Sequence, residues 1–110
     1  MEELDEIVQT VDLLQREFED LAMRGLRLTS PQQVAKLEML RTECQRIGAD
    51  HLAGRIGGLL EAIRNNDREA AAELLRAQSS LRVFERILTL QSVAALLQNQ
   101  SEPEGSEAGA

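Results

Sequence analysis

The chain has 110 residues, of which 43% are hydrophobic but only 2% are aromatic, and its formal net charge is −7 at pH 7. This length suggests one domain with a single core, and the scarcity of aromatic residues and of proline favours helices over strands. The acidity argues against a nucleic-acid binder, which needs a basic surface for phosphates, and against docking on anionic lipid.

The first predicted helix starts in the acidic N-terminal segment and ends at Gly25. Carboxylates are favoured in the first turn of a helix by its dipole, and glycine adopts the left-handed conformation that closes many helices. Apolar residues recur every three or four positions, as on one face of a helix. They are Leu4, Ile7, Val8, Val11, Leu14, Phe18 and Leu21.

The second helix has a well-defined start. Ser30 is the expected N-cap, Pro31 takes the first helical position, and Gln33 completes a capping box with Ser30. Gly48 predicts its end. The apolar face consists of Val34, Leu37, Leu40, Cys44 and Ile47.

A third helix is predicted after Asp50, which we take as its N-cap, and it ends at the pair Asn65-Asn66. Its apolar positions are Leu52, Ile56, Leu59, Leu60 and Ile63.

The fourth helix starts after Asp67 as cap and extends to about Leu97, with Ser79-Ser80 or Thr89 as places where it bends. From Gln98 onward alanine is the only apolar residue, which is typical of a disordered segment. Short connections favour antiparallel neighbours. The sequence therefore predicts an all-α fold: an up-and-down antiparallel four-helix bundle over residues 1–97, with a long fourth helix and a disordered acidic tail over residues 98–110.

His51 and Cys44 are the residues that invite a chemical interpretation. His51 is the only histidine, and no residue at ligand spacing accompanies it, so neither a metal site nor another cofactor is expected. Cys44 lies on an apolar face, where a free cysteine usually serves as a small buried hydrophobe. Gly54, Gly57 and Gly58 each cost about 1 kcal/mol inside a helix relative to alanine. We expect this cost to be offset by close approach of a neighbouring helix or of a partner.

Residues 34–90 resemble histidine-containing phosphotransfer domains, and within them the stretch EMLRTECQRIGADHLAGRIGGLLEAIRNNDREAAAELL (residues 38–75) is similar to the central hairpin of that family. These domains carry a His-x-Leu-Lys-Gly helix, a Gly-Ala turn, and a helix with a Leu-Glu pair. In this register Glu38 stands at the phosphoacceptor histidine, Arg41 at the lysine and Thr42 at the glycine. The resemblance implies a scaffold without the phosphoacceptor, and a receiver-type signalling domain that docks on the second and third helices.

Residues 24–53 show a fainter resemblance to helical segments of bacterial SWIM-type zinc-finger proteins, but the zinc ligands of that family are missing. The lone cysteine fits a reducing compartment. The acidic N-terminus is unlike a signal peptide, and no segment approaches the roughly 20 apolar residues of a membrane span. We therefore expect a soluble cytoplasmic protein.

We expect a non-catalytic protein–protein interaction module, an adaptor or a sequestering protein, rather than an enzyme. One alternative is a phosphotransfer protein that uses His51, and another is a structural homodimer in which the fourth helix pairs with its copy. Neither nucleic acid nor membrane is expected as a partner. The residues expected at the interaction surface are Glu38, Arg41, Thr42, His51, Gly54, Arg55 and Gly58.

Overall fold

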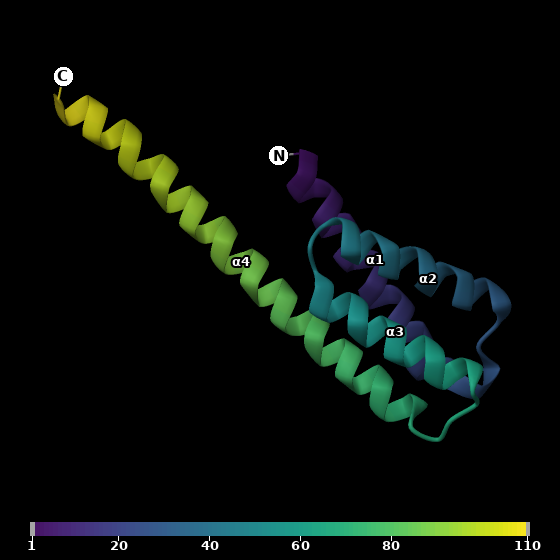
Figure 1. The fold of residues 1–110 in the computed structure, drawn as a ribbon. Coiled ribbons are helices and arrows are strands. Elements are labelled where there is room, and N and C mark those ends of the chain that lie inside the picture. The colour runs from purple at the N-terminus through teal and green to yellow at the C-terminus, as the bar shows by residue number, and fades with distance from the viewer. Residues whose placement is uncertain (1, 110) are drawn as a thin grey trace.

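The computed structural model describes residues 2–109, with side chains over residues 4–98. Consecutive helices run in opposite directions, and the last one extends far beyond the other three (Figure 1). The all-α up-and-down bundle with a long fourth helix is therefore confirmed. Its elements are α1 (Glu2–Arg24), the short 3-10 helix η1 (Leu26–Leu28), α2 (Pro31–Arg46), α3 (Asp50–Arg64) and α4 (Ala70–Gly109).

One apolar face of each helix forms the core. α1 and α3 each pack against both α2 and α4. Leu4 and Val8, which the periodicity assigns to the core face of α1, are instead 41% and 54% exposed. The largest fully buried side chains are Phe18, Leu14, Leu21, Leu37, Leu40, Ile56, Leu59, Leu60 and Cys44.

The predicted ends of α1 and α2 are confirmed. Gly25 and Gly48 have φ angles of 86° and 83°, in the region that residues with a side chain rarely adopt. The capping box is also present, because Ser30 Oγ accepts a hydrogen bond from the Gln33 backbone N–H at 3.2 Å. Gln33 Oε1 in turn accepts one from the Ser30 backbone N–H at 3.1 Å. Local chemistry thus determines where these two helices stop and start.

The start of α3 differs from the prediction. Ala49 is the N-cap, it makes no side-chain cap bond, and Asp50 is the first helical residue. Asp50 instead contributes a negative charge to the first turn, where the helix dipole favours it. The start of α4 also differs, because the helix begins at Ala70, three residues after the predicted cap Asp67. Asp67 Oδ1 instead accepts a hydrogen bond from the backbone N–H of Glu69 at 3.0 Å, within the turn that precedes the helix.

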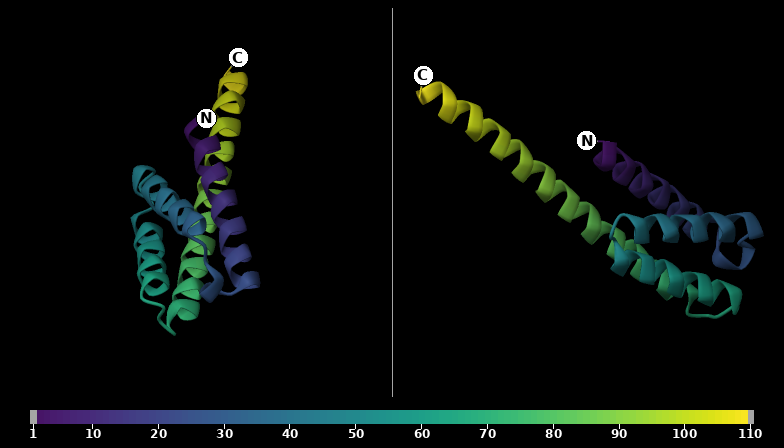
Figure 2. Two further views of the ribbon diagram at one scale, coloured as in Figure 1. Left: turned by 90° about the vertical axis from the view of Figure 1, so that its right-hand side faces the viewer. Right: turned by 45° about the horizontal axis from the view of Figure 1, so that its top comes forward.

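The fourth helix is continuous through the positions where a bend was expected. Thr89 Oγ1 donates to the backbone carbonyl of Glu85 at 3.0 Å, which satisfies the hydroxyl within the helix. The helical backbone continues beyond the predicted end to Gly109, which makes the molecule 66 Å long but only 22 × 21 Å across (Figure 2). The predicted disorder of residues 98–110 stays a prediction, because the side chains of residues 99–110 lie outside the described residues.

Candidate functional site

The α2 residues of the expected interaction surface form a polar cluster with α3. The Glu38 carboxylate pairs with Arg41 Nη2 at 3.1 Å and also with Arg64 of α3. Thr42 Oγ1 donates to the Glu38 backbone carbonyl at 3.1 Å. Arg41 Nε is buried and has no hydrogen-bond partner. Glu38 corresponds to the phosphoacceptor position of the resembled family. Its carboxylate forms ion pairs with two arginine side chains.

His51 lies in the first turn of α3 and is linked to the middle of α4. Its Nδ1 is 2.9 Å from Ser80 Oγ, in a hydrogen bond whose donor depends on the imidazole tautomer. Ser80 is buried whereas His51 is exposed. Because His51 stands at the start of α3, the part of α4 beyond Ser80 extends past that end of α3.

The three α3 glycines differ in what surrounds them. An added Cβ at Gly54 meets nothing within 4 Å. At Gly57 it meets Arg41 Nη1 at 3.5 Å, and at Gly58 it meets Glu73 Oε2 at 2.9 Å. The expected close approach of a neighbouring helix is therefore wrong for Gly54, which is open, whereas side chains of α2 and α4 lie over Gly57 and Gly58.

Two mainly apolar hollows flank the His51–Ser80 hydrogen bond and share Val83 of α4. The first, of about 300 Å³, extends along Phe84 and Ile87. The second, of about 340 Å³, also contains Arg55, one of the residues expected at the interaction surface. The structure thus brings His51 and Arg55 together at the α3–α4 edge. Glu38, Arg41 and Thr42 belong to the separate α2–α3 cluster.

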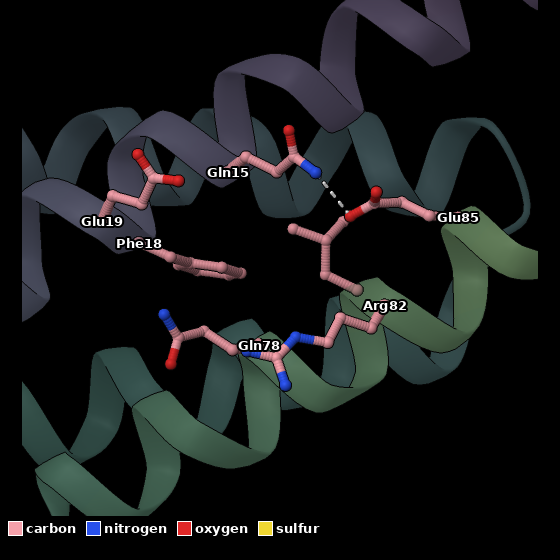
Figure 3. Close-up of a pocket in the computed structure, with 7 residues that line it drawn as sticks. Gln15, Phe18, Glu19, Gln78, Arg82 and Glu85 are labelled. Atoms are coloured by element: carbon pink, nitrogen blue, oxygen red, sulfur yellow. Dashed lines mark hydrogen bonds between the residues drawn. The ribbon is translucent and has the colours of Figure 1, made fainter.

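A third pocket, of about 180 Å³, lies where α1 meets α4 (Figure 3). The Phe18 ring lies between polar side chains of the two helices, and Gln15 Nε2 donates to Glu85 Oε1 at 2.8 Å. This contact connects α1 to α4 just before α4 leaves the bundle. The other residues that line the pocket are Glu19, Gln78, Leu81 and Arg82.

The most extensive feature near these hollows is a set of exposed apolar side chains along α4. We call it the α4 apolar surface: Val83, Ile87, Leu90, Val93 and Leu96, with exposed fractions of 58%, 46%, 63%, 47% and 61%. Sequence reasoning did not single these residues out. A signal was available, since no charged residue stands between Arg86 and Glu102.

Cys44 is fully buried, as expected. Burial, with a smaller effect from the charge of Glu43, raises the pKa of its thiol to about 11. In the part of the chain with described side chains, no three residues among His, Cys, Asp and Glu are grouped so that they could hold a metal ion. No helix in that part is both long and apolar enough to cross a membrane.

Comparison with family models, with curated proteins and with solved structures finds no match for this chain. The resemblances to phosphotransfer domains and to SWIM-type proteins therefore stay predictions.

Proposed function

We propose that this chain is a non-catalytic protein–protein interaction module that binds its partner through the α4 apolar surface. The observation that carries this proposal is the exposure of five large apolar side chains on a helix that projects from its own bundle. Scattered apolar residues are ordinary on a protein surface, whereas a contiguous set marks an interaction site.

The free energy available at this surface is sufficient for association only if the partner is also apolar. Complete burial of a Val, Leu or Ile side chain contributes about 1.5–3 kcal/mol. The five side chains are already about half buried, so covering them contributes roughly 4–8 kcal/mol. Association itself costs about 4–15 kcal/mol. The partner must therefore contribute a comparable apolar surface.

The phosphotransfer resemblance proposes a different docking site, on α2 and α3, for a receiver-type domain. Glu38 at that site is already paired with two arginines, and the neighbouring Arg41 lies over Gly57. A partner at this face would have to compete with ion pairs that the chain already makes. A partner that binds the α4 apolar surface does not have to break any of these ion pairs, and we therefore favour this surface.

A second candidate function is phosphotransfer through His51. The hydrogen bond to Ser80 engages Nδ1 of an exposed imidazole and thereby orients the ring. Arg55 lines the same hollow, and a guanidinium offsets the charge of a bound phosphoryl group. Incubation with a phosphorylated receiver domain, followed by mass measurement of the intact chain, tests this candidate. Phosphorylation that His51→Gln abolishes would establish it, and an unchanged mass would reject it.

Cross-linking in cells tests the interaction module directly. A photo-crosslinking amino acid replaces Leu90, on the α4 apolar surface, and in a matched control it replaces Met39, which is 55% exposed on α2. We expect protein adducts from position 90 and few from position 39. Equal adduct formation at both positions, or none at position 90, would overturn the proposal that α4 is the docking surface.

A further inference from the structure

We propose that the partner of the α4 apolar surface is a second copy of this chain, with the two α4 helices packed side by side in a symmetric dimer. This inference rests on the proposed function, because it names the occupant of the same surface. Three observations support it: the charge distribution, the spacing of the apolar residues and the size of the surface.

The charge distribution favours self-association at α4. The chain has a net charge of −7, so two copies repel each other over most of their surfaces. The segment from Ile87 to Ser101 contains no charged residue, and this repulsion is weakest there. A twofold dimer places the same patch of each copy against its equivalent, and an uncharged apolar patch is complementary to itself. A second copy therefore fits this segment without any opposite charge.

The spacing of the apolar residues is that of a helix-pairing seam. Val83, Ile87, Leu90 and Ala94 follow one another at steps of four, three and four residues. This alternation keeps one seam facing a partner helix, as in coiled coils. Val93 and Leu96 extend the apolar surface around the helix, away from this seam. A helix that is apolar on several sides is normally covered on several sides. A partner helix along the seam alone would therefore leave part of the apolar surface of α4 exposed.

The start of α1 offers a second exposed apolar face towards α4. Leu4 and Val8 stand one helical turn apart, and Gln15 lies two further turns along the same side of α1. Gln15 is hydrogen-bonded to Glu85 of α4, so this side of α1 faces α4. Leu4 and Val8 are nevertheless exposed. Glu85, however, lies about 140–160° around α4 from the seam, so a helix packed along the seam leaves Leu4 and Val8 uncovered.

The size of the surface agrees with a dimer. Residues 83–98 form a helical segment about 24 Å long, which as a cylinder about 10 Å across has roughly 750 Å² of lateral surface. Part of it already packs on the bundle. Two copies that cover most of the remainder bury on the order of 1,000 Å² in total, the lower bound for a specific interface. We therefore expect a dimer of moderate affinity.

The molecular mass of the purified full chain tests the inference. Sedimentation equilibrium is measured from about 1 to 500 µM, a range that spans moderate dissociation constants. We expect the mass to rise from 12.2 kDa towards twice that value. Leu90→Glu places a charge in the seam and should raise the dissociation constant by about 100-fold or more. Met39→Glu, the matched control on α2, should leave it unchanged.

Each outcome decides the inference. A wild-type chain that stays at 12.2 kDa throughout, or a Met39→Glu chain that dissociates as readily as Leu90→Glu, would overturn it. Circular dichroism establishes that both variants are folded, which is expected because both side chains are exposed. If the chain is monomeric and position 90 still cross-links to a different protein in cells, the inference of a dimer is wrong, whereas the proposed function as an interaction module is supported. If position 90 gives no adduct either, both fail.

Discussion

Replacement of Gly54 by alanine is expected to stabilise the protein. Gly54 lies inside α3, where its backbone is helical, and an added Cβ meets no atom within 4 Å. The new methyl group therefore neither clashes nor displaces a neighbour. What remains is the difference in backbone entropy, because glycine loses more conformational freedom than alanine when a helix forms.

The magnitude follows from helix propensity. Glycine is less favourable than alanine by about 0.8–1.0 kcal/mol in a helix interior. We therefore predict that Gly54→Ala raises the free energy of unfolding by about 1 kcal/mol, which corresponds to about 4–8 °C in Tm for a domain of this size. Gly58→Ala is the matched contrast, since its methyl group would lie 2.9 Å from Glu73 Oε2. Glu73 must then move and disturb its 2.7 Å ion pair with Arg76, so the gain should be smaller.

Urea and thermal unfolding, followed by circular dichroism at one protein concentration, measure both effects. The concentration is held constant because self-association would add to the apparent stability. A loss of stability in Gly54→Ala would refute the reasoning, because it would mean that something packs against Gly54. A larger gain from Gly58→Ala than from Gly54→Ala would refute the contrast.

Three other predictions concern the core, a helix cap and the buried thiol. Leu59→Ala should lower the free energy of unfolding by about 2–5 kcal/mol in urea denaturation, since Leu59 is fully buried; a change under about 0.5 kcal/mol would contradict its placement. Ser30→Ala removes the acceptor of the Gln33 N–H and should cost about 1 kcal/mol in the same assay. Cys44 should react with a thiol reagent only after unfolding; rapid reaction of the folded chain would show that it is accessible. Burial raises the pKa of the Cys44 thiol to about 11, so the folded state favours the protonated thiol. This preference contributes fully to the free energy of unfolding below the unfolded pKa of about 8.5, and the contribution is lost as the pH rises towards 11.

The helix boundaries were predictable from the sequence where a residue acts on its immediate neighbours. Ser30 caps its own helix, and Gly25 and Gly48 adopt the positive φ that ends theirs. Asp50 shows the limit of this reasoning. Its type suits a cap, but the turn after Gly48 leaves Ala49, which is buried, at the cap position. The cap position depends on how the whole turn packs, which residue type does not determine.

The candidate site was less predictable, because periodicity does not reveal how far a neighbouring helix extends. α1 has 23 residues but α3 has only 15. Leu4 and Val8 carry a regular core pattern and still end up exposed, since the pattern does not show where the packing partners stop. The bond between His51 and Ser80 joins positions 29 residues apart, and sequence spacing alone gives no sign of it. The contacts that link helices were therefore the part that sequence reasoning could not supply.

The continuity of α4 has a consequence for the direction in which its outer end faces. One unbroken helix joins the bundle to the segment beyond Leu88, so the two parts share one rotational phase. An extra residue in between would turn the outer segment by about 100° and advance it by about 1.5 Å, whereas four extra residues would turn it by only about 40°. Ser80 is hydrogen-bonded to His51 of α3, which fixes the position of α4 in the bundle. The number of residues between Ser80 and Leu90 therefore determines the direction in which the outer apolar face points relative to the bundle.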